Sequence, residues 1–295
     1  NPNRPGCNSG QGNLAAAGVV FVLLAALNRE ARARGLFQGR EAPDIRAWMD
    51  LAAMGAICDV TGMTGFNRAL TRLGLGVMSA WGNPGLKALL AAAGAEQKPA
   101  TTNHAGFILG PRINAGGRIG RSDLGARLLS TDDPAEAARL AAELQALNGA
   151  RREVEAAVTE AAVRRVEASG AHDDGSAVVV VEGEDWHPGV VGIVAGRLRE
   201  RWRKPVVVIG VDPATGVGKG SGRSQTGVNL GHAVQAAWER GLLLAGGGHA
   251  MAAGLTVASG GVDAVRDFLN DRLAGESVEA AAQDWVEIDA LIAVG

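Results

Sequence analysis

The chain has 295 residues, of which 47% are hydrophobic and 20% are charged, so it can form a core and is not disordered throughout. Its formal net charge of −2 excludes a histone-like basic protein but allows a local basic surface. Two cysteines, Cys7 and Cys58, cannot make a disulfide framework, which favours a reducing, cytoplasmic location. No apolar run approaches the about 20 residues that span a membrane.

The N-terminal part of the chain has a mainly helical pattern. Val20, Leu23, Leu24 and Leu27 fall on one stripe and predict a helix over residues 14–34. Further helices are predicted at 45–57, 68–75 and 84–93. Residues 104–125 then change character, because glycines become dense and arginines recur.

A long helix is predicted next, over residues 133–169. Asp133 can cap it, Pro134 suits the first helical position, and Glu136 can close a capping box. A helix of this length would run about 54 Å at 1.5 Å per residue, with Gly149 as its one weak point. A narrow apolar stripe on so long a helix is typical of a connector between two lobes.

After residue 170 strands and helices alternate, which predicts an α/β domain with a mixed or parallel sheet. Strands are predicted at 177–181, 206–209, 218–224 and 255–257, and helices at 189–201, 229–240 and 262–273. A polar link beyond Gly275 leads to one apparent strand from Trp285 that then stops. Because a lone strand is not stable and residue 1 is not Met, we expect a fragment cut at both ends.

The segment GPRINAGGRIGRS, residues 110–122, is the first of four glycine-rich candidates for binding chemistry. Its arginines, Arg112 and Arg118 among them, present planar forks that match phosphate oxygens, and glycine turns let the backbone approach a ligand. The alternative interpretation is a surface loop with solvated arginines.

The second candidate is EDWHPGVVG, in which His187 precedes a helix that begins at Pro188. A helix N-terminus favours an anion, and His187 can donate to a phosphate there. Taken alone, the segment favours a simpler interpretation, in which His187 caps the helix and Trp186 packs.

The third candidate, GKGSGRS at 218–224, is not a Walker A loop but has the composition of a phosphate cradle. If it is a strand, Ser221 and Arg223 share one face and Lys219 joins them. The alternative is an edge strand with a solvated basic face.

The fourth candidate is the run Gly246 to Gly248 before His249, whose successive N–H groups can form an anion-binding nest. A tight packing point is the alternative, because Ala, Leu and Met flank the run.

Acidic candidates are fewer. Asp59 follows an apolar segment and has the chemistry to bind a hard cation, but one carboxylate makes no metal site. From the residues alone, a turn Asp that bonds the following backbone is the favoured interpretation. His104 stands alone and is interpreted as structural.

Together these segments resemble the RecJ single-stranded-DNA exonucleases of the DHH phosphoesterase superfamily. The matching pieces occur in the family's order: NPNRPGC at 1–7, LAAMGAICDVTGMTGFNRAL at 51–70, GPRINAGGRIG at 110–120, WHPGVVGIVAGRL at 186–198, KGSGRS at 219–224 and GGGHAMAAG at 246–254. The resemblance covers nearly the whole chain, and it raises the functional interpretations of these segments above the alternatives.

The resemblance implies an α/β fold in parts. These are the mainly helical remainder of a DHH catalytic domain (1–132), a long connecting helix (133–170), a DHH-associated substrate-binding domain with a mixed sheet (171–275) and the start of a truncated OB-fold (276–295). It implies that Asp59 is a metal ligand for Mn²⁺ or Mg²⁺. The residues that it assigns to substrate phosphates, together with the candidates above, are Arg112, Arg118, His187, Ser221, Arg223, Gly247, Gly248 and His249.

The resemblance also implies the activity: metal-dependent 5′-to-3′ hydrolysis of single-stranded DNA in repair and recombination. The expected partners are single-stranded DNA and single-strand-binding or helicase proteins, with no membrane and a monomeric chain. No Asp-His-His triplet occurs in the sequence, so the site is incomplete and we expect this polypeptide to be inactive alone. Two alternatives remain, a phosphodiesterase of short oligonucleotides or cyclic dinucleotides and a non-catalytic nucleic-acid-binding module.

Overall fold

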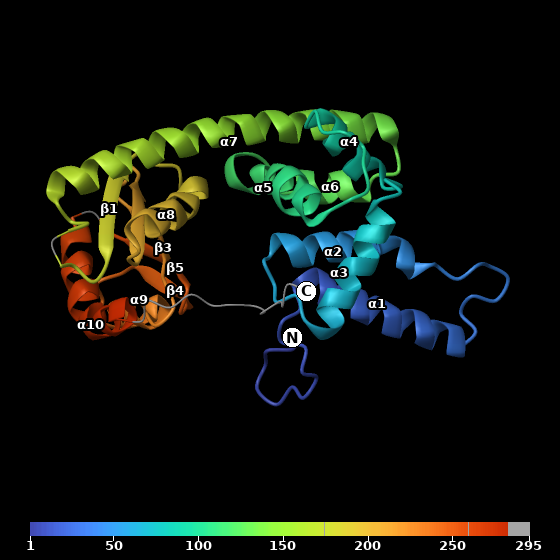
Figure 1. Ribbon diagram of the computed structural model, residues 1–295, viewed down its shortest axis with the longest axis horizontal. Helices are drawn as coiled ribbons and strands as arrows, with labels where there is room; N and C mark the ends of the chain where they lie inside the picture. The colour runs from blue at the N-terminus through green and yellow to red at the C-terminus, as the bar shows by residue number, and fades with distance from the viewer. Residues whose placement is uncertain (174, 259, 283–295) are drawn as a thin grey trace, which may run out of the picture. The chain divides into compact units, whose positions relative to one another are not determined.

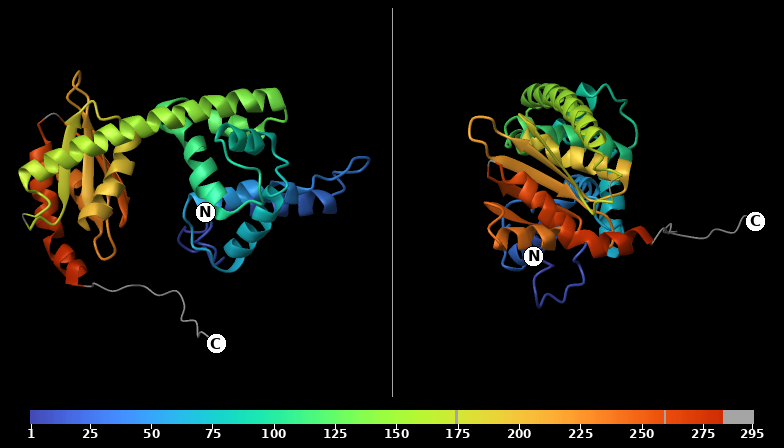
Figure 2. Two further views of the ribbon diagram at one scale, coloured as in Figure 1. Left: turned by 45° about the horizontal axis from the view of Figure 1, so that its top comes forward. Right: turned by 90° about the vertical axis from the view of Figure 1, so that its left-hand side faces the viewer.

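The computed structural model describes residues 1–173, 175–258 and 260–282. The chain divides into two compact units, Asn1–Gly149 and Ala150–Gly295. One helix, α7 (Pro134–Ser169), belongs to both and is drawn without a break in Figures 1 and 2. The fold is mixed α/β, with helices in the first unit and a sheet in the second, as the sequence predicted.

The first unit is helical. Its elements are α1 (Ala16–Ala33), η1 (Ile45–Trp48), α2 (Met49–Cys58), α3 (Gly65–Met78), α4 (Pro84–Ala92), the π-helical turn η2 (His104–Leu109), α5 (Gly110–Ile119) and α6 (Leu124–Ser130). A core forms where α4, η2, α6 and the first part of α7 meet, with Leu89, Leu109, Leu128 and Leu140 fully buried.

The apolar stripe of α7 contributes to two cores. Leu140 and Leu144 are buried in the first unit, and Val158, Ala162 and Val166 are buried in the second. The helix begins as predicted, because the Asp133 carboxylate accepts from the N–H of Ala135 at 2.9 Å. The predicted capping box is wrong, since Glu136 instead accepts from Arg127 and from the Thr131 hydroxyl.

A five-stranded sheet forms the centre of the second unit, in the order β1-β2-β3-β5-β4 (Figure 1). The strands are β1 (Val179–Glu184), β2 (Val206–Val211), β3 (Gly218–Arg223), β4 (Ala245–His249) and β5 (Ala252–Val257). β1 and β2 are parallel, whereas every other neighbouring pair is antiparallel. The sheet is therefore mixed, in agreement with the sequence.

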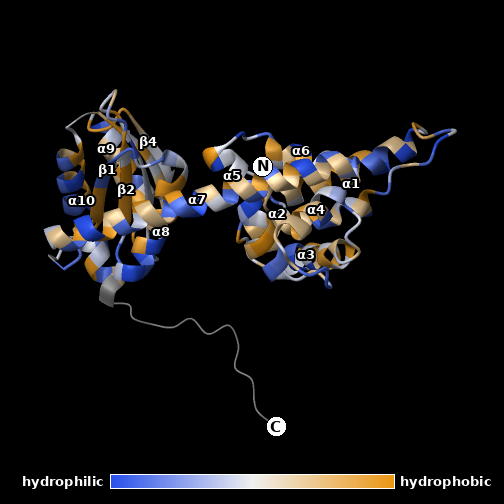
Figure 3. Ribbon diagram, turned by 90° about the horizontal axis from the view of Figure 1, so that it is seen from above, coloured by the Kyte–Doolittle hydropathy of each residue, from blue (hydrophilic) through white to orange (hydrophobic). Residues whose placement is uncertain are grey.

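Helices cover both faces of this sheet. Val206 and Val208 pack with α8 (Pro188–Trp202) and the last part of α7 on one side. Val207 and Ile209 pack with α9 (Leu230–Glu239) and α10 (Val262–Ala282) on the other. Because side chains alternate along a strand, the continuous apolar run of β2, orange in Figure 3, fills both cores.

The sequence interpretation needs two corrections in its glycine-rich parts. Residues 110–119 form the helix α5 rather than turns, and residues 245–249 form the edge strand β4 rather than a nest. Successive N–H groups of a strand point to opposite sides, so the three glycines do not converge on one anion. The physical reason for both differences is packing, because Gly110 and Gly246 each lie against a neighbouring element.

The C-terminal helix also differs from its prediction. α10 continues to Ala282, beyond the predicted end at residue 273, so a helix replaces the expected polar link after Gly275. The predicted strand from Trp285 lies outside the described residues.

Candidate phosphate-binding face of the sheet

Three polar side chains of β3 lie on one face of the sheet. Lys219, Ser221 and Arg223 alternate along the strand with Gly220 and Gly222, so they point to the same side. An Nη1–Oγ hydrogen bond of 3.0 Å joins Arg223 to Ser221, which agrees with the predicted alternation.

Glycines from the neighbouring strands continue this face. Ser221 is paired with Gly254 on β5, and Gly254 is paired with Gly247 on β4. Residues directly opposite each other in a sheet point to the same side. A Cβ atom placed on Gly247 or Gly254 would meet no heavy atom of the described chain within 4 Å. Beside Ser221 the sheet therefore presents backbone without side chains. We call the surface formed by five residues the open face: Lys219, Ser221, Arg223, Gly247 and Gly254.

The glycines of the opposite side are packed. A Cβ on Gly222 would lie 2.5 Å from Leu230 Cδ2, and one on Gly220 would lie 2.8 Å from Leu255 Cδ1. Gly248 also faces this side, where a Cβ would lie 2.9 Å from that of Ala253. Of the two predicted phosphate-binding glycines, Gly247 lies on the open face and Gly248 does not.

Arg223 is the strongest cationic feature of the open face. Its side chain is half-buried, and Nη1 donates to the carbonyl oxygen of Gly222 as well as to Ser221. No carboxylate in the described residues forms a salt bridge with it. Burial lowers the pKa of the Arg223 guanidinium, because desolvation disfavours its charged form. An anion bound here would supply the missing counter-charge, and a guanidinium matches phosphate bidentately.

The backbone of α8 forms a wall beside this arginine. A Cβ on Gly192 would lie 2.9 Å from Arg223 Nη2 and 2.9 Å from Ser221 Oγ. Glycine at this position therefore lets the helix approach both side chains closely. The sequence analysis missed Gly192 and Gly254 because nothing in the local pattern separates them from other glycines.

His249 ends β4 at the margin of the open face and is exposed. Ala252 is paired both with His249 and with Arg223, so the two predicted residues lie in one row across the sheet. With strands about 4.8 Å apart, roughly 10 Å separates their backbones. This spacing places His249 at the edge of the face rather than against Arg223.

His187 caps α8. Its Nδ1 accepts from the N–H of Gly189 at 3.0 Å, and Trp186 is buried, as in the simpler interpretation of this segment. Because Nδ1 is an acceptor, a neutral His187 ring carries its proton on Nε2, from which it can still donate. Its role as a phosphate ligand stays a prediction.

The predicted arginines of the first unit have different surroundings. Arg112 is half-buried, and it donates from Nε to Gln145 on α7 at 2.7 Å and from Nη1 to the Ile108 carbonyl oxygen at 2.6 Å. Arg118 is exposed on the last turn of α5. Both residues belong to the first unit and the open face to the second, so their predicted common pocket stays a prediction.

Asp59 follows the last residue of α2 and is exposed. The turn beyond it is held by Asn67, which is fully buried and donates to Thr61 Oγ1 at 2.8 Å and to the Gly62 carbonyl oxygen at 2.9 Å. Among residues 1–173, 175–258 and 260–282, no group of three or more His, Cys, Asp or Glu side chains is suited to a metal ion. The described residues thus provide one candidate ligand and do not form a metal site by themselves.

Comparison with known proteins agrees with this architecture. Residues 174–275 match the DHHA1 domain, which corresponds to the unit that carries the open face. The single-stranded-DNA-specific exonuclease RecJ of Dickeya dadantii is 37% identical over 292 residues, or 97% of this chain. Over nearly its whole length this chain is homologous to part of the RecJ exonucleases, and its second unit matches a DHHA1 domain.

The solved structures of RecJ from Thermus thermophilus show the same fold. The complexes with Mn²⁺ and Mg²⁺ match 88% of this chain, with TM-scores of 0.71 and 0.70 and 32% sequence identity. The match covers 50% of the Dickeya dadantii RecJ, and 36% and 38% of the two crystallised RecJ chains. The chain therefore spans half or less of these relatives. Within its described part, no helix is both long and apolar enough to cross a membrane.

Proposed function

We propose that this chain is part of a RecJ-type exonuclease and that its open face binds a phosphate of single-stranded DNA. The observation that carries the proposal is Arg223, a half-buried guanidinium without a carboxylate in the described residues, beside the bare backbone of Gly247 and Gly254. Glycine lets a phosphate approach the backbone, and Arg223 and Ser221 supply its donors. The names of the relatives support DNA as the source of that phosphate.

In the whole protein we expect hydrolysis of terminal phosphodiesters from the 5′ end. Asp59 would supply one oxygen ligand to a divalent ion, in keeping with the Mn²⁺ and Mg²⁺ in the related structures. The described residues contain no group of three or more His, Cys, Asp or Glu side chains suited to a metal ion, so we derive no chemical step through a metal. We expect the purified chain to bind single-stranded DNA without cleaving it.

Binding of a 5′-phosphorylated, fluorescently labelled single strand to the purified chain tests the proposal. Arg223→Gln removes the guanidinium and should weaken binding by about tenfold or more, since one charge-assisted contact is worth about 1.5–3 kcal/mol. Arg203→Gln removes the same charge from an exposed position at the end of α8 and serves as the matched control.

The two variants should separate clearly. If Arg203→Gln and Arg223→Gln weaken binding equally, only net charge matters and the open face has no special role. Cleavage of the labelled strand by the chain with added Mn²⁺ would contradict the expectation that it is inactive alone. The family's role in repair and recombination, a monomeric state, a cytoplasmic location and helicase or single-strand-binding partners stay predictions.

A further inference from the structure

A pocket lies at one end of the open face. A pocket of about 510 Å³ is formed by the loop before α8, by the hairpin that joins β2 to β3, and by Lys219. Ligand pockets have volumes of about 300–1,000 Å³, so the space suits a nucleoside-sized group. We call this site the hairpin pocket.

One wall of the hairpin pocket is apolar and fixed in place. Trp186 is 8% exposed. The neighbouring strands β1 and β2 approach it closely at two glycines, Gly183 and Gly210. A Cβ on Gly183 would lie 2.1 Å from its ring, and a Cβ on Gly210 would lie 1.9 Å from its carbonyl oxygen. The guanidinium of Arg165 lies 5.4 Å from the ring centroid. Pro188, Val211 and Val217 extend this apolar lining.

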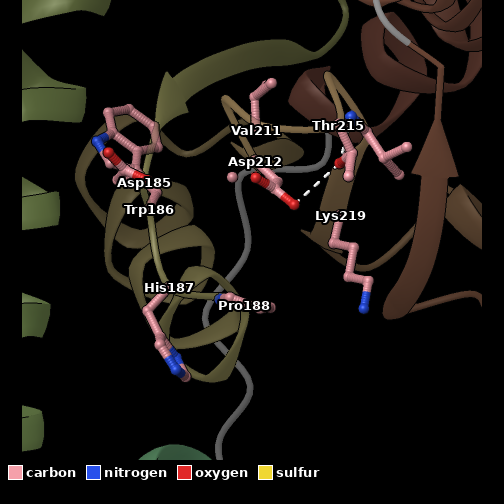
Figure 4. Close-up of a pocket in the computed structure, with 10 residues that line it drawn as sticks. Asp185, Trp186, His187, Pro188, Val211, Asp212, Thr215 and Lys219 are labelled. Atoms are coloured by element: carbon pink, nitrogen blue, oxygen red, sulfur yellow. Dashed lines mark hydrogen bonds between the residues drawn. The ribbon is translucent and has the colours of Figure 1, made fainter.

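The opposite wall is polar, and Figure 4 shows Asp212, Thr215 and Lys219 across the pocket from Trp186. Asp212 accepts from the N–H of Ala214 and from the Thr215 hydroxyl, each at 2.9 Å. These bonds lower the pKa of the Asp212 carboxyl, which therefore stays an ionised acceptor near neutral pH. The wall thus combines a carboxylate acceptor with the ammonium donor of Lys219.

Lys219 connects this pocket with the open face. It lies on the same side of β3 as Ser221 and Arg223, four residues from Arg223. At about 3.4 Å per residue, the two cations are roughly 14 Å apart along the strand. That separation exceeds the length of one nucleotide. If a single-stranded DNA is bound by its phosphate at Arg223, the nucleoside that reaches the hairpin pocket is therefore one further along the DNA.

We propose that the hairpin pocket binds a base of the same single strand, one or two nucleotides beyond the phosphate at Arg223. This inference rests on the proposed function. The base would lie against Trp186, Pro188 and Val217, and an amino or ring N–H group of the base would donate to Asp212. Lys219 would contact the phosphate between the two sites. Every base has an apolar face, so the pocket would give affinity with little sequence preference.

The affinities of 5′-phosphorylated mono-, di- and trinucleotides for the purified chain test this inference, measured by competition against a labelled single strand. Affinity should rise by about tenfold between the mononucleotide and the trinucleotide, because one well-packed base contributes a factor of this order. A trinucleotide that lacks its second and third bases should lose that gain.

Two variants address the pocket directly. Val217→Phe fills the space and should abolish the gain in affinity with oligonucleotide length while changing mononucleotide affinity by less than about twofold. Lys219→Gln removes an ammonium that belongs to both the open face and the hairpin pocket, and it should also abolish the gain with length. Val22→Phe on α1 and Lys87→Gln on α4 make the same substitutions at exposed positions of the first unit and should preserve the gain. If Val217→Phe does not fold, Lys219→Gln and the abasic trinucleotide still decide the outcome.

The result can separate this inference from the proposed function. If Arg223→Gln lowers mononucleotide affinity but both pocket variants keep the full gain with length, the hairpin pocket does not hold a base. The same conclusion follows if the abasic trinucleotide binds as tightly as the normal one. If Arg223→Gln leaves mononucleotide affinity unchanged, the phosphate site itself is wrong.

Discussion

The segments 110–119 and 218–223 look alike in sequence, since both combine several glycines with arginine. The first forms α5, where Arg112 is bonded to Gln145 and to a backbone carbonyl oxygen. The second forms β3, where Arg223 donates to Ser221 and to the Gly222 carbonyl oxygen and has no carboxylate partner in the described residues. Composition is therefore shared, but the arginine of α5 is bonded to a side chain of another helix, whereas that of β3 is bonded within its own strand.

The glycines of the two segments also differ in use. In α5, a Cβ on Gly110 would lie 2.6 Å from Cys58 Sγ, and one on Gly116 would lie 3.1 Å from Leu144 Cδ2. In β3, Gly220 and Gly222 face the side of the sheet that packs against Leu230 and Leu255. The polar residues that alternate with them face the opposite side, which is the open face. Glycine makes close helix packing possible in α5. In β3, glycine lets one side of the strand pack closely while the alternating polar residues face the other side.

The largest expected effect comes from filling the packed side of β3. Gly222→Val places a side chain against Leu230 and Val207 and should lower the free energy of unfolding by about 3 kcal/mol. Gly254→Val, on the open face of the neighbouring strand, should change it by less than about 0.5 kcal/mol. Urea denaturation of both variants measures this contrast, and equal losses of stability would show that the open face is packed.

A smaller loss is expected in α5. Gly110→Ala should lower the free energy of unfolding by about 2 kcal/mol, because its Cβ would meet Cys58 Sγ and the Ala105 carbonyl oxygen. Adding Cys58→Ala should recover part of that loss, since it removes one of the two clashes. The double-mutant cycle by thermal or urea unfolding is the measurement. A strictly additive cycle would mean that the two residues are not in contact.

The two arginines should respond in opposite ways. Arg112→Gln should destabilise the protein by about 1–2 kcal/mol, because the acceptors on Gln145 and Ile108 lose their donor. Arg223→Gln should destabilise it less, by about 0.5–1 kcal/mol, because both of its acceptors lie within β3, and should mainly weaken binding of single-stranded DNA. Unfolding and binding measured on the same two preparations test the comparison. It fails if Arg223→Gln is the more destabilising substitution.

The smallest effect is on the salt dependence of binding. Loss of one phosphate contact should reduce the slope of log affinity against log salt by about 0.7 for a single strand. We expect this change for Arg223→Gln and none for the control Arg203→Gln, which removes the same charge from an exposed position at the end of α8. Titrations at several salt concentrations give the slopes. An unchanged slope for Arg223→Gln would indicate that it does not contact a phosphate.

Much of the fold follows from local periodicity. The spacing of apolar residues predicted α1 and α7 close to their observed bounds, and alternation predicted that Ser221 and Arg223 share a face. These patterns are readable because a helix repeats every 3.6 residues and a strand every two. Asp133 was also recognised as a cap, because its effect depends only on the next two residues.

The sequence by itself thus determined most element types outside the glycine-rich segments, the mixed α/β class and the polar side of β3. Tertiary structure decided that residues 110–119 are a helix, that β4 completes the sheet edge, and which glycines are packed. It also decided that Arg112 is held by Gln145, 33 residues further along the chain. The physical reason is that the partner of a glycine or a guanidinium comes from a distant segment, and local periodicity carries no information about which segments meet.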